Sequence, residues 1–137
     1  MTELSSVYEY AEDIANAMPP SPLPVREYRA SVRAIEPRIS KTSGKPMAVV
    51  TYLISADQYP ADFTEGNPDG EVLPYYQPLE DTTKNRYLLR KFCEKHGVVG
   101  GTRLNLPDFI GQDVIIAVTH EDYQGVPQAR ANPVRAV

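Results

Sequence analysis

The fold is decided in residues 25–56, which read VREYRASVRAIEPRISKTSGKPMAVVTYLISA. Two runs rich in β-branched and aromatic residues, Val25–Arg38 and Met47–Ala56, flank a short polar segment, Lys41–Lys45. Such side chains favour strands, and a glycine-containing segment between two such runs is typical of a hairpin connection. The stretch therefore predicts two strands joined by a basic turn.

The rest of the chain adds three elements in a fixed order. A third short run covers Glu71–Gln77, a helical pattern covers Thr82–His96, and a final hairpin covers Asp113–Val137. Three strands, one helix and two further strands form the element order of a five-stranded Greek-key barrel of the OB type. We therefore expect an all-β domain with one helix, of a class that commonly binds single-stranded nucleic acid.

The 137 residues are expected to form one domain preceded by a leader. Prolines at positions 19, 20, 22 and 24 place the boundary between residues 1–22 and a barrel of residues 23–137. Helical spacing of the leader's apolar residues predicts a short amphipathic acidic helix, with the stripe Val7, Tyr10, Ile14 and Met18. Three interpretations of the leader stay open. It docks on its own barrel or on a second subunit, it recruits partners or competes with DNA for the basic face, or it is disordered.

Charge is unevenly distributed along the chain. The leader, residues 1–22, holds four acidic residues and no basic one, which equals the net charge of −4. Residues 23–56 carry six basic residues against two acidic ones, and residues 57–71 carry five acidic residues and no basic one. Because Lys and Arg make the phosphate contacts of nucleic-acid binders, residues 23–56 are the part expected to touch a ligand.

Strand alternation predicts which side chains of the first strand face outward. Tyr28, Ala30, Val32 and Ala34 are expected in the core, with Ile35 on the outer face. The basic residues expected on or beside the binding face are Arg26, Arg29, Arg33, Arg38, Lys41, Lys45 and, from the final hairpin, Arg130. An alternative is that exposed strand charges only prevent edge-to-edge pairing of sheets.

Four tyrosines are candidates for stacking on bases: Tyr52, Tyr75, Tyr76 and Tyr123. A base stacked on an aromatic ring contributes about 1–3 kcal/mol, with little dependence on sequence. Tyr75 and Tyr76 are neighbours on a strand, so one ring should point inward and the other outward. Packing inside the barrel is the alternative for each of them.

No pattern indicates catalysis, a metal or a cofactor. The sequence contains no carboxylate pair, ligand cluster or nucleophile–base spacing that would identify an active site. Residues Glu65, Asn67 and Asp69 echo the start of a calcium loop, but its last ligand position falls on Tyr76 rather than a glutamate. One cysteine, no signal segment and no run of 18 apolar residues favour a cytoplasmic protein without a membrane span.

Several short motifs between residues 25 and 137 resemble a known family. They are Gly44-Lys45-Pro46-Met47, Leu88–Cys93, Phe109-Ile110-Gly111-Gln112-Asp113-Val114 and Tyr123-Gln124-Gly125. Together they resemble small phage proteins of the single-stranded-DNA-binding OB class, many of which belong to replication or recombination gene clusters. The resemblance implies an OB fold, sequence-independent binding of single-stranded DNA, and self-association.

The sequence thus predicts a noncatalytic protein that binds single-stranded DNA through basic residues and tyrosines. It also predicts that residues 1–22 are where replication or recombination proteins would bind. The alternative is a protein-interaction module that uses the leader and the acidic 57–70 loop, with the barrel as a scaffold.

Overall fold

The computed structural model describes residues 5–19, 21–61, 63 and 72–137. Five strands, β1 (Glu27–Ile39), β2 (Pro46–Ile54), β3 (Tyr75–Pro78), β4 (Asp113–Tyr123) and β5 (Val126–Ala136), accompany one α-helix, α1 (Thr83–Lys95). Short 3₁₀ helices occur at η1 (Ile14–Asn16), η2 (Ala56–Gln58) and η3 (Leu106–Phe109). The predicted mostly-β fold of five strands, with one helix between the third and fourth strands, is confirmed. The suggested calcium loop and the predicted start of the third strand at Glu71 lie outside the described residues.

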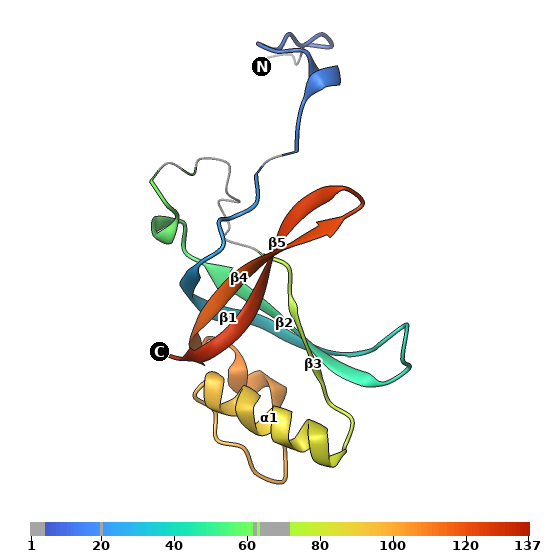
Figure 1. Cartoon of the computed structure of the whole chain (residues 1–137), viewed down its shortest axis with the longest axis vertical. Coiled ribbons are helices and arrows are strands. Elements are labelled where there is room, and N and C mark those ends of the chain that lie inside the picture. The colour runs from blue at the N-terminus through green and yellow to red at the C-terminus, as the bar shows by residue number, and fades with distance from the viewer. Residues whose placement is uncertain (1–4, 20, 62, 64–71) are drawn as a thin grey trace.

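The five strands form one curled sheet in the order β3-β2-β1-β4-β5, with all neighbours antiparallel. Just before β3, Leu73 forms a parallel bridge with Arg130 of β5. The Leu73 N–H donates to the Ala129 carbonyl at 2.8 Å, and the Ala131 N–H donates to the Leu73 carbonyl at 3.2 Å. The two edges of the sheet therefore meet, and the sheet wraps round a core (Figure 1).

Strand β1 contains a bulge that changes which side chains are buried. Tyr28, Ala30 and Val32 are buried, as the alternation predicts. The pairing with β2 shifts between Val32 and Ala34, and after this shift Ile35 is buried. The prediction of Ile35 on the outer face and Ala34 in the core is therefore wrong, because the extra residue at a bulge reverses the alternation beyond it.

Helix α1 lies at one end of the barrel (Figure 1) and is fixed at both of its termini. The Thr82 hydroxyl accepts the Asn85 N–H at 3.1 Å as an N-cap. At the other end, Gly97 has φ +68°, its N–H donates to the Glu94 carbonyl, and the Val98 N–H donates to the Cys93 carbonyl. These two bonds form a Schellman motif, which needs the left-handed conformation that glycine adopts without strain.

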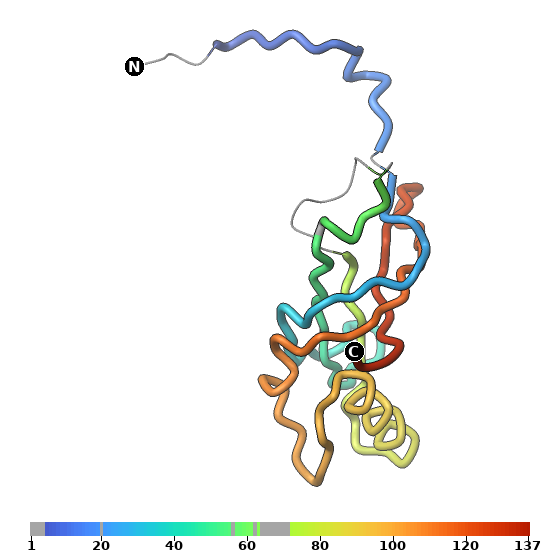
Figure 2. The backbone as a smooth tube through the Cα atoms, turned by 90° about the vertical axis from the view of Figure 1, so that its left-hand side faces the viewer, coloured from blue at the N-terminus to red at the C-terminus, as the bar shows by residue number. Residues whose placement is uncertain are grey.

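The leader differs from the sequence prediction. Among residues 5–19 the structure contains only the single 3₁₀ turn η1, capped by Asp13. The stripe of Val7, Tyr10, Ile14 and Met18 is 67–85% exposed, so it packs on nothing here. The predicted amphipathic α-helix is therefore wrong. A helix this short is marginal in water unless tertiary packing covers its apolar face, and this leader extends away from the barrel (Figure 2).

In the part of the chain that the structure describes, no helix is long and apolar enough to cross a membrane.

Candidate nucleic-acid interface

The outer face of β2 and β3 is one surface that combines an open aromatic ring with a neighbouring cation. Along β2, Ala48, Val50, Tyr52 and Ile54 belong to the core cluster, so the alternate residues face outward. Strand pairing then places Val49 between Glu36 of β1 and Tyr76 of β3. We call this surface the β2–β3 face and define it by Glu36, Arg38, Met47, Val49, Thr51 and Tyr76.

The neighbouring tyrosines of β3 point in opposite directions, as predicted. The Tyr75 ring stacks on the buried ring of Phe92, with centroids 6.2 Å apart and planes inclined by 14°. Tyr76 is 44% exposed on the β2–β3 face. Tyr75 therefore contributes to the core, while Tyr76 offers a ring to a ligand.

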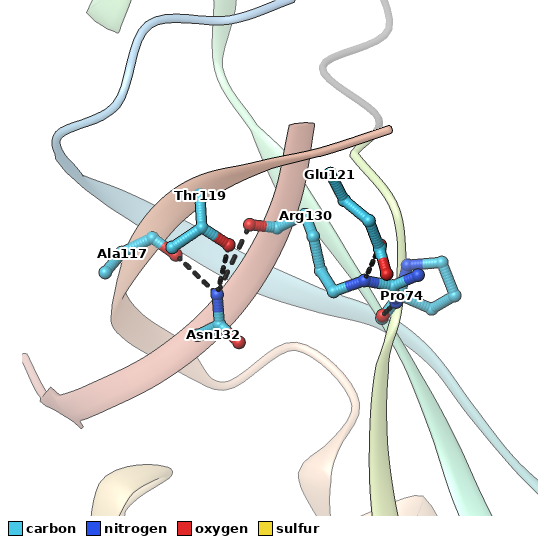
Figure 3. Close-up of polar contacts among 6 residues, drawn as sticks. All are labelled: Pro74, Ala117, Thr119, Glu121, Arg130 and Asn132. Carbon is cyan, nitrogen blue, oxygen red and sulfur yellow. Dashed lines mark hydrogen bonds and ion pairs between the residues drawn. The ribbon is translucent and has the colours of Figure 1, made fainter. Parts of the chain in front are cut away.

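Arg130 of β5 holds its guanidinium over the Tyr76 ring, 5.2 Å from the centroid. The same side chain donates to the Glu121 carboxylate and to the Pro74 carbonyl (Figure 3). Only 22% of the Arg130 side chain is exposed. Arg130 thus joins β4, β5 and the segment before β3, and its charge is already paired. Its main effect on the face is to orient Tyr76 through a cation–π contact.

Asn132 supports the same part of β5 from the next outward position. Its side-chain amide donates to the Ala117 carbonyl at 3.3 Å and to the Thr119 hydroxyl at 3.1 Å (Figure 3). Both acceptors lie on β4, which pairs with β5 here. The β4–β5 ribbon is therefore tied together by side chains as well as by its backbone ladder.

The predicted basic residues separate into two groups. Arg29 forms an ion pair with Asp113 of β4 at 2.9 Å, and strand pairing places it opposite Ile115. The Gln58 side chain bonds both the backbone N–H and the backbone carbonyl of Arg29, at 2.8 and 2.5 Å. The Arg26 guanidinium lies 5.7 Å from the centroid of Tyr28. These arginines belong to the β1–β4 side of the barrel, whereas Tyr76 lies on β3.

The second basic group surrounds the β1–β2 turn. Arg38 lies 3.6 Å from Glu36, and Lys45 lies 3.2 Å from Glu80. All four side chains are 39–63% exposed, and Lys41 is exposed in the turn itself. Exposed ion pairs of this kind contribute little, about 0–1 kcal/mol, so a phosphate can replace the carboxylate at small cost. We call Arg38, Lys41 and Lys45 the turn cations. Arg33 is exposed at the bulge between the two basic groups.

Tyr52 belongs to the core and offers no ring face to a ligand. It is fully buried, and its hydroxyl lies 2.6 Å from His96 Nε2. The opposite ring nitrogen of His96, Nδ1, lies 2.6 Å from the Phe92 carbonyl. A carbonyl can only accept, so Nδ1 donates, and in a neutral imidazole Nε2 then accepts from Tyr52. Burial raises the pKa of Tyr52 and lowers the pKa of His96, which keeps both groups uncharged.

Tyr123 lies at the tip of the β4–β5 hairpin and is 62% exposed. The turn that follows has positive φ at Gln124 (53°) and Gly125 (81°), as a tight two-residue hairpin connection requires. The β4–β5 and β1–β2 turns project toward the same side of the molecule in Figure 1. Tyr123 and Lys41 therefore mark two projecting loops on one side of the barrel.

Sequence reasoning missed several members of this surface. The run Met47–Ile54 is apolar on both of its faces, so its outward set could not be assigned from hydrophobicity alone. Pairing with β1 places Thr51 and Val49 on the outer side of β2, where Val49 is only 6% exposed. The bond between Gln58 and Arg29 joins residues 29 positions apart and has no local sequence signal.

The described residues place their one cysteine in the core and bring no set of metal ligands together. Among them, no group of three or more His, Cys, Asp or Glu side chains could hold a metal ion. Cys93 is buried, and burial is the main cause that raises the pKa of its thiol, which disfavours the reactive thiolate.

No protein-family model matches this chain, and no curated protein matches it either.

Proposed function

We propose that this protein binds single-stranded nucleic acid, with single-stranded DNA as the expected ligand, on the β2–β3 face. The observation that carries the proposal is the exposed Tyr76 ring, held beneath Arg130 and flanked by a cation-bearing turn. An aromatic ring beside positive charge is the combination used to bind single strands without reading their sequence.

The topology supports an OB-type barrel as part of this proposal. Strand β1 pairs with both β2 and β4, the segment before β3 runs parallel to β5, and α1 follows β3. OB barrels bind oligonucleotides on the face of their second and third strands, between the first and the last inter-strand loops. Those two loops correspond to the β1–β2 turn and the β4–β5 turn of this chain.

In the proposed complex, one base stacks on Tyr76 and a second stacks on Tyr123. The turn cations neutralise phosphates as the strand passes the β1–β2 turn. Tyr52 and Tyr75 are left out of this contact set because their rings pack in the core. The protein acts as a binder and not as an enzyme, and the resemblance to phage proteins suggests a role in DNA replication or recombination in the host cytoplasm.

A titration tests this function directly. A fluorescent oligo-dT of about 30 nucleotides should bind at low salt, while the matching duplex should bind far more weakly because its bases are not free to stack. If three turn cations contact phosphates, affinity should fall roughly twentyfold between 50 and 200 mM salt. No binding at 50 mM salt, or equal binding to the duplex, would contradict the proposal.

A second candidate function is a protein-interaction module. Its supporting observation is the leader, where Val7, Tyr8, Tyr10, Ile14 and Met18 are all at least 61% exposed. Exposed apolar side chains beside acidic ones suit a protein partner better than a nucleic acid. This version predicts no retention on single-stranded DNA at low salt.

A further inference from the structure

An open groove runs between α1 and the segment that follows it. It has a volume of about 850 Å³ and lies at the end of the barrel that α1 covers (Figure 1). Its apolar lining consists of Leu79, Leu89, Cys93, Val98, Val99 and Leu104. Val99 is 96% exposed. None of these residues belongs to the β2–β3 face, so the proposed nucleic-acid site does not account for the groove.

The helix beside the groove carries an excess of basic residues. Helix α1 carries five basic residues, Lys84, Arg86, Arg90, Lys91 and Lys95, against Glu94, a balance of +4. The groove lining itself holds three arginines and two carboxylates, a balance of +1: Arg86, Arg90, Arg103, Asp81 and Glu94. An occupant with apolar side chains and negative charge would match both the lining and the rim.

The leader of this same chain has that composition. Residues 1–22 carry a charge of −4, opposite and equal to the balance on α1. Its apolar side chains are unpacked, with Ile14 70% and Met18 85% exposed. Large exposed apolar side chains grouped on one segment usually mark an interaction site.

The geometry directs a leader away from the groove of its own barrel. Leu23 is buried, and its carbonyl accepts from His120 Nε2 at 2.8 Å. The next carbonyl, that of Pro24, accepts from the Tyr28 hydroxyl at 2.9 Å. These contacts fix where the leader leaves the barrel, and Figures 1 and 2 show it leaving at the end opposite α1 and pointing outward.

We propose that the leader of one copy docks in the groove beside α1 of a second copy. Ile14 and Met18 enter the apolar lining, and the leader carboxylates face the basic surface of α1. The two contacting surfaces are different, so the contact is heterologous and can repeat head to tail. This proposal stands on the leader and the groove, and it does not require nucleic-acid binding.

The mass of the full chain in solution tests the contact. Sedimentation equilibrium at low salt should give an average mass that rises above the 15.3 kDa of the monomer as concentration increases. Added salt should reduce the association because it screens the opposite charges. A mass that stays at the monomer value at all concentrations would overturn the proposal.

Variants that change only the leader or only the groove make this test more specific. Ile14→Asp with Met18→Asp damages the leader, and Val99→Asp damages the groove; all three positions are exposed, so folding should not suffer. Ile39→Asp is a matched control, since Ile39 is 65% exposed on β1 and lies outside both surfaces. The leader and groove variants should each be monomeric, while the control should associate like the original chain.

Mixing the two damaged variants distinguishes docking in a groove from contact between two leaders. The Val99→Asp variant keeps an intact leader, and the leader variant keeps an intact groove. Their equimolar mixture should therefore regain dimers that neither forms alone. If Val99→Asp self-associates normally, or if the mixture stays monomeric, the leader does not bind this groove.

Discussion

The contact between Tyr52 and His96 shows how one residue can be assigned to two different roles. From the sequence, Tyr52 qualifies as a base-stacking ring because it stands on a strand beside a basic turn. In the structure, its hydroxyl is 2.6 Å from His96, the C-cap residue of α1, and both side chains are fully buried. The pair therefore holds the helix against the barrel.

Replacing Tyr52 by phenylalanine should lower the free energy of unfolding by about 1–3 kcal/mol, because His96 Nε2 is left buried without its hydrogen-bond donor. Urea denaturation followed by circular dichroism measures this change. Tyr87→Phe is the matched control, since Tyr87 is 56% exposed on α1. It should be within about 0.5 kcal/mol of the original chain, as is usual for surface substitutions. Equal stabilities of the two variants would refute the role given to Tyr52.

His96 should titrate below its ordinary pKa of 6.5, because burial in the core disfavours the imidazolium. Between the lowered pKa and 6.5, the unfolded chain binds more protons than the folded one, so stability falls as pH decreases below about 6.5. A nuclear magnetic resonance titration of the ring protons measures the midpoint. His120→Gln assigns the signals, since the chain contains two histidines. A His96 midpoint at or above 6.5 would contradict the burial argument.

The turn cations should control the salt dependence of DNA binding. Arg38→Ala with Lys41→Ala should reduce the steepness of log affinity against log salt by about 1.4, since each lost phosphate contact on a single strand removes roughly 0.7. Arg29→Ala is the control, because this arginine lies on the β1–β4 side, paired with Asp113. An unchanged slope in the double variant, or an equal reduction in Arg29→Ala, would mean that the strand follows another path.

At the scale of elements, residues with a local conformational role were the most predictable. The predicted helix ends at His96, directly before Gly97, and the structure places Gly97 in a Schellman motif. The approximate positions of β1, β2, β4 and β5 follow from runs of strand-forming residues separated by turns, whereas β3 is confined to Tyr75–Pro78. These features depend on neighbours in sequence, which is why sequence patterns reveal them.

Gly97→Ala should cost about 1–2 kcal/mol, because its φ of +68° crowds any Cβ against its own backbone. The space around this position is open, with no atom within 4 Å of an added Cβ, so strain in the backbone is the whole effect. Gly101→Ala is an internal control with equally open surroundings and no positive φ. Thermal unfolding should separate the two variants; indistinguishable midpoints would rule out the strain argument.

Features that depend on contacts between residues far apart in the chain could not be predicted from the sequence. The bulge in β1 follows from how β2 pairs with it, and it moved Ile35 into the core. The leader has the spacing of an amphipathic helix but no surface of its own barrel to cover that stripe. Likewise, the candidate interface needs Arg130 of β5 to lie over Tyr76 of β3, which only closure of the sheet brings about.

At the scale of the whole molecule, the structure separates two surfaces. The β2–β3 face with its projecting turns is the proposed site for a nucleic-acid strand. The groove beside α1 is the proposed site for a second copy. Because the leader leaves the barrel at the end opposite α1 (Figure 1), head-to-tail contacts would join opposite ends of neighbouring barrels.

The most direct test of the central claim compares two tyrosine variants in their affinity for fluorescent oligo-dT. Tyr76→Ala removes the 44% exposed ring of the β2–β3 face, while Tyr87→Ala removes a 56% exposed ring on α1 that also has a nearby cation, Lys91. Loss of one stacked base predicts affinity about tenfold weaker or more for Tyr76→Ala, with Tyr87→Ala unchanged. If Tyr76→Ala binds as tightly as the original chain, the strand does not lie on the β2–β3 face.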